Sequence, residues 1–296
     1  MSEAAGRAVA FIGLGNMGTP MSARLVQAGF AVRAFDLSAD ARTRAAAGGA
    51  EVFDSAAVAA ESAAILILML PNSEIVASVV DQLLEAGAIA PGSLVVDMSS
   101  SEPMETRKLA ARLDAAGIGM VDAPVSGGVK GAVNGTLTIM TGGPDDSVAR
   151  VASVLAPLGK VKHAGAIGAG HAVKALNNLL SATHLWVTSE AIEVGRRFGL
   201  DPAVMLDIFN DSSGRSGSTE NKWPNFILPG TFNSGFGLRL MVKDMKIAVQ
   251  LAESTDSPSQ LGQRAVDLWG LAAAELDSAA DHTEVARWIA EHPEEG

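Results

Sequence analysis

Three glycines near the start of the chain carry the clearest chemical meaning. Gly13, Gly15 and Gly18 have G-x-G-x-x-G spacing and follow the apolar run Val9–Ile12, which predicts a buried strand. In this motif the first glycine permits a tight turn, the second lets backbone approach a pyrophosphate, and the third lets a helix pack on the strand. We expect a helix over Asn16–Ala28 whose first N–H groups face the phosphates.

A carboxylate follows where a dinucleotide site needs one. Asp36 comes directly after the second predicted strand, Ala31–Phe35, and lies 18 positions after the last motif glycine. An Asp at this distance accepts hydrogen bonds from ribose hydroxyls, and its charge disfavours a 2′-phosphate. The segment Asp36-Leu37-Ser38 has no arginine to offset that charge. Together these features predict an NAD site, with these cofactor-binding residues: Gly13, Leu14, Gly15, Asn16, Met17, Gly18 and Asp36.

A second polar segment follows a predicted strand in the middle of the chain. Asp122–Gly128 reads DAPVSGG. The Ser126 hydroxyl and the N–H groups around Gly127 and Gly128 can form a concave site for a carboxylate. S-G-G is also common turn chemistry, so its position after a strand is what favours the functional interpretation.

A lysine and an asparagine share one face of a long predicted helix. Lys174 and Asn178 stand i,i+4 in the segment GAGHAVKALNN, which begins at Gly168. A lysine in the first turns of a helix is usually solvated. A desolvated lysine can instead donate a proton to a carbonyl oxygen or stabilise an alkoxide, with Asn178 holding the lysine or the substrate.

The elements that must position these groups alternate between short apolar strands and helices. Strands are predicted at Val9–Ile12, Ala31–Phe35, Ile65–Leu70, Leu94–Asp97, Gly119–Asp122 and Leu137–Thr141. This alternation predicts an α/β fold with a Rossmann-type, doubly wound parallel sheet, whose ligands bind beyond the carboxyl ends of the strands. After about residue 165 the pattern is helical, and a long helix is predicted over Gly168–Phe198. We expect a dinucleotide-binding domain at 1–165 and an all-α domain for substrate binding and oligomerisation at 166–296.

Composition narrows the classes of function. The net charge of −11 disfavours nucleic acid and acidic membrane surfaces as partners. The absence of cysteine excludes disulfides, a thiol nucleophile and cysteine-ligated zinc. The histidines show no metal-ligand spacing, so we expect neither a metal nor a Ser–His–Asp site. The N-terminus does not look like a signal peptide, and the apolar run Ala63–Leu70 is too short to span a membrane, so we expect a cytoplasmic protein.

Four segments together resemble the β-hydroxyacid dehydrogenase family, which includes 3-hydroxyisobutyrate dehydrogenase and tartronate semialdehyde reductase. They are FIGLGNMG, DAPVSGG, G-x-G-x-x-x-K-x-x-N-N and a late Lys243-Asp244 pair, which by itself reads as an exposed charge pair. The resemblance covers nearly the whole chain and implies a 6-phosphogluconate dehydrogenase-like helical domain and homodimers or homotetramers. The roles it implies are these: Lys174 catalytic; Asn178, Ser126, Gly127 and Gly128 substrate-binding; Leu70 and Pro71 beside the adenosine; Ser100 near the nicotinamide; Lys243 closing over the cofactor.

The resemblance implies an NAD-dependent oxidoreductase that interconverts a small 3-hydroxy acid and its semialdehyde or keto acid. The loop Asp211–Ser218 resembles the S-S-G-R segment of 3-hydroxyisobutyrate dehydrogenases, but Gly217 stands where those often have tryptophan. A larger acid of the threonate or 2-(hydroxymethyl)glutarate type therefore stays open. In that case Arg215 either meets a second carboxylate or pairs within its loop.

Three further alternatives are less favoured. Lys174, Asn178 and S-G-G together speak against an imine reductase and against a catalytically silent NAD-binding regulator. A decarboxylating sugar-phosphate dehydrogenase would need a longer chain and a basic cluster for the phosphate. The chain has no tyrosine, so tyrosine cannot be the proton donor.

Overall fold

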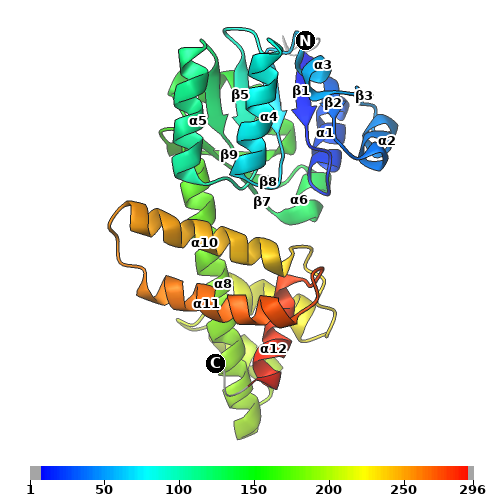
Figure 1. Ribbon diagram of the computed structural model, residues 1–296. Helices are drawn as coiled ribbons and strands as arrows, with labels where there is room; N and C mark the ends of the chain where they lie inside the picture. Colours follow the sequence, from blue (N-terminus) through cyan, green and yellow to red (C-terminus); the bar gives the residue numbers. More distant parts are fainter. Residues whose placement is uncertain (1–7, 293–296) are drawn as a thin grey trace. The chain divides into compact units, whose positions relative to one another are not determined.

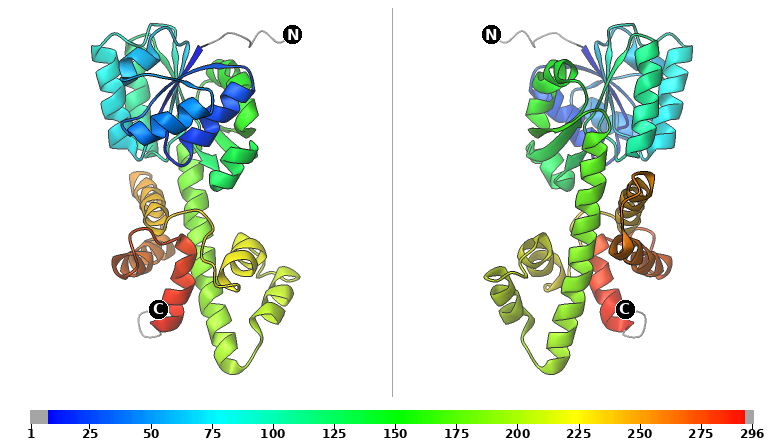
Figure 2. Two further views of the ribbon diagram at one scale, coloured as in Figure 1. Left: turned by 90° about the vertical axis from the view of Figure 1, so that its right-hand side faces the viewer. Right: turned by 90° about the vertical axis from the view of Figure 1, so that its left-hand side faces the viewer.

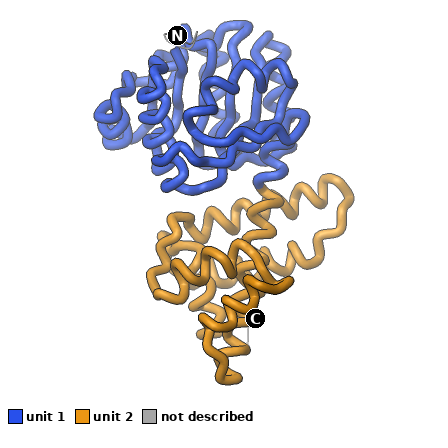
Figure 3. The backbone as a smooth tube through the Cα atoms, turned by 180° about the vertical axis from the view of Figure 1, so that it is seen from behind, with its two compact units in different colours: residues 1–174 blue, residues 175–296 orange. Residues whose placement is uncertain are grey.

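The computed structural model describes residues 8–292, which are shown in Figure 1 and from two further directions in Figure 2. The chain forms two compact units, Met1–Lys174 and Ala175–Gly296 (Figure 3). The predicted boundary between residues 165 and 166 precedes the long helix, whereas the division between the units falls within that helix.

The first unit is built on a mostly parallel sheet. The order of neighbouring strands is β3-β2-β1-β4-β5-β6-β8-β7, and β9 pairs with β8. The pairs from β3 to β6 are parallel, whereas β8 is antiparallel to β6 and β7. The strands are β1 (Ala8–Ile12), β2 (Ala31–Phe35), β3 (Glu51–Val52), β4 (Ile65–Leu68), β5 (Leu94–Asp97), β6 (Gly119–Asp122), β7 (Val125–Ser126), β8 (Leu137–Gly142) and β9 (Gly159–Gly165).

Helices cover both faces of this sheet. Successive residues of β1 show why: Phe11 packs into a core with α1, α2 and α7, whereas Ile12 packs into a core with α3, α4 and α5. Both views of Figure 2 show α4 and α5 on one side of the strands and α1 on the other. The helices of this unit are α1 (Gly18–Gln27), α2 (Ala39–Ala47), α3 (Ala56–Ala60), α4 (Ser73–Glu85), α5 (Pro103–Ala115), α6 (Gly128–Asn134) and α7 (Asp145–Leu155).

The carboxyl ends of the central strands lie side by side at one edge. The register pairs Ile12 with Leu68, Leu68 with Asp97, and Asp97 with Asp122. The chain proceeds from β1 to β2 on one side and crosses back to β4 on the other, so β1 stands where the strand order reverses. Ligands of such sheets bind in the crevice beyond this point. The segments that follow β1, β4, β5 and β6 therefore form the edge at which a site is expected.

The second unit is helical. Its core contains four tryptophans, three of which lie next to one another: the ring centroids of Trp186 and Trp269 lie 6.2 Å apart, and those of Trp186 and Trp288 lie 5.9 Å apart. The long helix α8 begins in the first unit and continues here. The helices are α8 (Ala169–Phe198), α9 (Pro202–Asn210), the π-helix η2 (Ser218–Ile227), α10 (Leu238–Ser254), α11 (Gln260–Glu275) and α12 (Val285–Glu291).

Candidate active site

The glycine motif forms the turn from β1 into α1, and the three glycines meet different constraints. Gly13 has φ +99°, and a Cβ there would collide with the carbonyl oxygen of Met69. A Cβ at Gly18 would collide with the carbonyl oxygen of Gly13. A Cβ at Gly15 would meet no protein atom within 4 Å. The fold therefore needs the first and third glycines, whereas the second leaves open space of the kind a pyrophosphate needs.

Asp36 contacts this turn directly. Its Oδ2 accepts a hydrogen bond of 2.6 Å from the N–H of Leu14, and its Oδ1 accepts one of 2.7 Å from the N–H of Ser38. The carboxylate after β2 is thus held against the glycine turn, where ribose hydroxyls would approach. The residues present fit a dinucleotide.

An arginine that the sequence argument did not consider also reaches this loop. Arg42 lies on α2, and its Nη1 donates to the carbonyl oxygen of Asp36 at 2.7 Å and to that of Leu37 at 3.3 Å. The absence of arginine from positions 36–38 therefore does not exclude an arginine at this loop, because Arg42, one helical turn after Ser38, contacts it. Arg42 thus contacts the loop whose carboxylate would face the ribose.

The segments after β4 and β5 are joined at the same edge. The N–H of Leu70 donates to Ser99 Oγ at 2.9 Å, and the Ser99 N–H donates to Asp97 Oδ1 at 2.9 Å. Leu70 and Ser100 are half-buried and Pro71 is exposed. The predicted cofactor-binding residues of these two segments thus lie beyond strands β4 and β5, as expected from their order in the sheet.

The predicted carboxylate site lies between β6 and α6. Ser126 ends β7, and Gly127 and Gly128 have φ of +130° and +61°, in the region that favours glycine. A Cβ at Gly128 would meet no protein atom within 4 Å. The backbone here is not shielded by side chains, which is what an anion site made of N–H groups requires.

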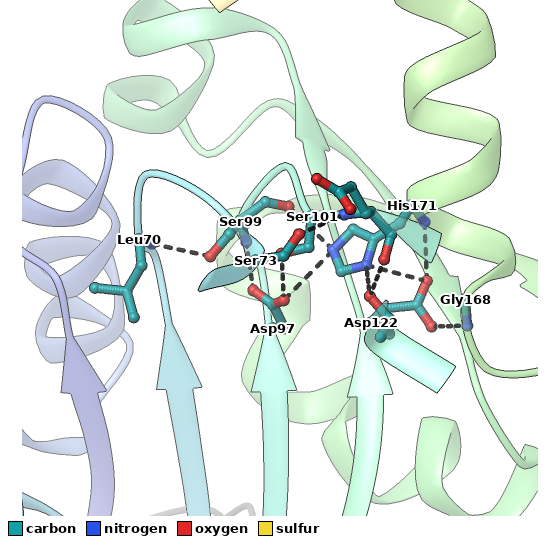
Figure 4. Close-up of polar contacts among 10 residues, drawn as sticks. Leu70, Ser73, Asp97, Ser99, Ser101, Asp122, Gly168 and His171 are labelled. Carbon is teal, nitrogen blue, oxygen red and sulfur yellow. Dashed lines mark hydrogen bonds and ion pairs between the residues drawn. The ribbon is translucent and has the colours of Figure 1, made fainter. Parts of the chain in front are cut away.

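Two aspartates that the sequence analysis did not single out lie at the centre of the edge. Asp97 and Asp122 end β5 and β6, and both are fully buried. Figure 4 shows the imidazole of His171, from the first turn of α8, between their carboxylates. His171 Nε2 is 3.8 Å from Asp97 Oδ2, and Nδ1 is 4.0 Å from Asp122 Oδ2. The sequence feature that could have identified this pair is that two successive predicted strands, Leu94–Asp97 and Gly119–Asp122, each end in an aspartate.

The predicted catalytic pair lies on α8. Lys174 is 7% exposed and Asn178 is likewise buried, so the interpretation of Lys174 as a solvated side chain does not describe this structure. Asn178 Nδ2 donates to Asp244 Oδ2 at 2.6 Å, and Lys243 Nζ lies 3.3 Å from Asp244 Oδ1. Asp244 is buried, so the interpretation of Lys243 and Asp244 as an exposed pair is wrong. The carboxylate of Asp244 fixes which way the Asn178 amide points.

Arg215, in the loop Asp211–Ser218, pairs with a side chain of this chain. Arg215 Nε forms an ion pair of 2.8 Å with Glu220 Oε1, and the Arg215 side chain is 63% exposed. Glu220 lies on the following π-helix, so Arg215 pairs just outside its loop rather than within it. The π-helix Ser218–Ile227, which contains Pro224, was not predicted. Proline lacks an N–H and disturbs regular α-helical bonding, so periodicity is a poor guide there.

A Ser–His–Asp contact in the second unit does not make a nucleophile. Ser234 Oγ donates a hydrogen bond to Asp281 Oδ1 at 2.8 Å. His282 Nδ1 lies 3.0 Å from the carbonyl oxygen of Phe236, and because a carbonyl oxygen can only accept, Nδ1 carries a hydrogen and donates it there. The serine proton is thus committed to the carboxylate rather than to an imidazole acceptor. Burial lowers the pKa of His282 to about 4.

Within residues 8–292, no group of three or more His, Asp or Glu side chains could hold a metal ion.

The fold and these residues define the class of protein. A doubly wound sheet with a glycine turn and a carboxylate after β2, followed by a helical unit, is the architecture of a dinucleotide-dependent dehydrogenase. None of the helices in the described part of the chain is both long and apolar enough to span a bilayer.

Comparison with known proteins identifies the family. A model of the NAD binding domain of 6-phosphogluconate dehydrogenase matches residues 8–183, and one described as NAD-binding of NADP-dependent 3-hydroxyisobutyrate dehydrogenase matches residues 168–289. The chain is 40% identical to a 3-hydroxyisobutyrate dehydrogenase of Pseudomonas aeruginosa, over 90% of this chain and 92% of that one. The chain belongs to the β-hydroxyacid dehydrogenase family. It is a hydroxyacid dehydrogenase with an NAD-type cofactor.

Two further relatives are similar over most of their length. The 2-(hydroxymethyl)glutarate dehydrogenase of Eubacterium barkeri is 38% identical, over 88% of this chain and 87% of that one. The solved structure of Mycobacterium tuberculosis 3-hydroxyisobutyrate dehydrogenase with L-serine superposes with a TM-score of 0.91 at 35% identity, covering 96% of this chain and 99% of that one. The predicted fold class is confirmed.

The different constraints on the glycines give a testable separation of binding from folding. We expect Gly15→Ala to fold normally but to bind NAD at least about tenfold more weakly, because only the ligand needs that space. Gly18→Ala should lower the melting temperature, because its Cβ meets backbone. Calorimetric NAD titration and thermal unfolding of both variants measure this. Unchanged NAD affinity in Gly15→Ala would contradict the assignment.

Proposed function

We propose that the enzyme oxidises the hydroxyl group of a small 3-hydroxy acid with NAD, and reduces the corresponding semialdehyde or keto acid in the opposite direction. The observation that carries the proposal is a buried lysine, Lys174, one turn before Asn178 on α8. A lysine kept from water is suited to proton transfer rather than to solubility. Relatives named for 3-hydroxyisobutyrate and 2-(hydroxymethyl)glutarate support the substrate class.

Different residues of the chain would bind the substrate, orient it and transfer the proton. Ser126, Gly127 and Gly128 would hold the substrate carboxylate, and Asn178 would orient the lysine or the substrate through its amide. In reduction the Lys174 ammonium would donate a proton to the carbonyl oxygen, and in oxidation its amine would accept the hydroxyl proton. NAD, when bound, supplies the hydride acceptor, while the protein supplies position and charge.

Removal of the lysine amine tests the catalytic role. Lys174→Ala should lower kcat by roughly 10²–10⁴, the range for losing a positioned acid–base group, with little change in NAD affinity. Lys160→Ala, on the exposed edge of β9, is the matched control. Initial rates followed by cofactor absorbance measure kcat for both variants. A Lys174→Ala enzyme that keeps more than about a tenth of its kcat refutes the role.

Cofactor choice is proposed to favour NAD over NADP. The Asp36 carboxylate would repel a 2′-phosphate, and the Arg42 guanidinium already donates to two carbonyl oxygens of the loop. We expect kcat/KM to be about tenfold to a hundredfold higher with NAD, which corresponds to one close charge repulsion near the surface. Asp36→Ala should reduce this ratio, because it removes the charge that repels the 2′-phosphate. Similar kcat/KM values for both cofactors would overturn the proposal.

Substrate size is proposed to depend on the loop around Gly217. A Cβ at Gly217 would meet no protein atom within 4 Å, so a larger side chain can be introduced there. We expect the parent enzyme to prefer threonate or 2-(hydroxymethyl)glutarate over 3-hydroxyisobutyrate, and Gly217→Trp to lose that preference. Amides of the same acids should be inactive, because a site built for an anion is poorly satisfied by a neutral group. Strong preference of the parent for 3-hydroxyisobutyrate, or equal turnover of amides, contradicts this account.

A homodimer or homotetramer is proposed from the surface of α8. Leu180, Val187 and Val194 recur every seven residues and are 60%, 53% and 69% exposed. An apolar stripe at this spacing on a long helix suits packing against another helix, and a second copy of the chain is the occupant proposed. The cytoplasmic location expected from the sequence stays a prediction.

Mass measurement in solution tests this assembly. Light scattering after size-exclusion chromatography should give two or four times the chain mass of 30.3 kDa. The double variant Leu180→Glu/Val187→Glu should shift the protein toward monomer, because it places charge in the apolar seam. Val58→Glu, at an exposed apolar position of the first unit, is the control. A monomeric parent contradicts the proposal.

A further inference from the structure

Two buried carboxylates stand side by side at the ends of β5 and β6. Asp97 and Asp122 are register partners on parallel strands, and neither is accessible to solvent. Adjacent strands lie about 4.8 Å apart, so the two negative charges would repel strongly in this water-free setting unless other groups offset them.

Hydrogen-bond donors meet each carboxylate. Asp97 accepts from the N–H of Ser99 at 2.9 Å and from Ser101 Oγ at 2.7 Å. Asp122 accepts from the backbone N–H of Gly168 at 2.7 Å and of His171 at 2.9 Å. Asp122 thus receives N–H groups from the start of α8, the end of the helix that favours negative charge.

The close approach of α8 to Asp122 depends on a glycine. A Cβ at Gly170 would collide with the carbonyl oxygen of Met140 and would lie 2.8 Å from Asp122 Oδ2. The first turn of α8 is therefore packed against the sheet without an intervening side chain, and its position is closely defined.

The hydrogen bonds of the His171 ring assign one nitrogen as a donor. Nε2 lies 3.1 Å from the carbonyl oxygen of Ser99, which can only accept, so Nε2 carries hydrogen. Nδ1 lies 2.8 Å from Thr106 Oγ1, a hydroxyl that can donate or accept and that also lies 3.0 Å from the carbonyl oxygen of Glu102. When the Thr106 proton goes to Glu102, Nδ1 is a second donor, and an imidazole with two N–H groups is the charged form.

We propose that His171 is held as an imidazolium between Asp97 and Asp122, and that this contact positions the first turn of α8 and with it Lys174. One positive charge between two negative ones offsets their repulsion, and Figure 4 shows the ring in that place. Lys174 follows three residues later on the same helix. Among the ion pairs that the structure describes for residues 8–292, Asp97 and Asp122 are the charged groups next to the ring. His171 is a positioning residue, and its effect on catalysis rests on the proposed role of Lys174.

The charge of the ring can be observed directly in the parent enzyme. With labelled histidine, the nitrogen resonances of His171 at about pH 7.5 should show two protonated ring nitrogens, where an ordinary histidine is mostly neutral. The buried His282, whose pKa is lowered by burial to about 4, is the neutral internal reference. A neutral His171 ring at this pH overturns the charge assignment.

A pair of substitutions tests the compensation without relying on activity. Asp97→Asn alone should lower the melting temperature, because the imidazolium loses a partner. In the His171→Gln background the same substitution should raise it, because it removes an uncompensated carboxylate. This reversal of sign requires a charge interaction; the same sign in both backgrounds contradicts it.

Kinetics test the positioning role. His171→Gln should lower kcat about tenfold to a hundredfold, the scale of a misplacement near 1 Å, with unchanged NAD affinity. The double variant with Asp97→Asn should recover part of kcat, and His292→Gln should match the parent. Unchanged kcat in His171→Gln, in an enzyme that Lys174→Ala inactivates, overturns the positioning role. Full activity of Lys174→Ala would instead refute the proposed function, while the resonance and stability measurements still decide the charge.

Discussion

The carboxylate pair at the ends of β5 and β6 constrains where the first turn of α8 lies. Two aspartates in register, both buried, require hydrogen-bond donors: Ser99 and Ser101 donate to Asp97, and the start of α8 donates to Asp122. The constraint acts in both directions. The helix satisfies Asp122, and Asp122 in turn fixes where the helix begins, which sets the position of the lysine one turn later.

The parallel sheet places the carboxylate pair at the same edge as the expected ligand site. Because the carboxyl ends of β1, β4, β5 and β6 lie at one edge, the glycine turn, the Leu70 segment and the carboxylate pair all face the place where a doubly wound fold binds its ligand. Hydrogen bonds connect neighbouring segments, as between Leu70 and Ser99. Helix α8 then carries Asn178, whose amide is fixed by the buried Asp244. Rigid elements rather than loops therefore hold Lys174 and Asn178.

The sequence was informative where function depends on local pattern. The strands Ala31–Phe35, Leu94–Asp97 and Gly119–Asp122 were predicted with the bounds observed. The last two are short, almost fully buried apolar runs, as is typical of parallel strands, whereas Ala31–Phe35 alternates between buried and more exposed positions. The two-residue strands β3 and β7 were missed, as was the largely exposed β9, because none has such a run. Helix α1 begins at Gly18 rather than Asn16, since Gly13–Met17 form the turn.

Contacts between distant segments could not be predicted from spacing. Asp97, Asp122 and His171 are far apart in the chain, and only the register of β5 with β6 and the docking of α8 bring them together. The contact between Arg42 and Asp36 was not predicted for the same reason, because it forms only when α2 is folded. The fold was therefore easier to predict than the partners of its polar groups.

The most direct measurement is a crystal structure of the enzyme with NAD and a 3-hydroxy acid bound. The account predicts Lys174 Nζ within about 2.6–3.2 Å of the substrate's hydroxyl oxygen, the distance that proton transfer requires. It also predicts the substrate carboxylate on Ser126–Gly128 and the His171 ring still between its two aspartates. A substrate oxygen that contacts another side chain, with Lys174 turned away from it, would contradict the account.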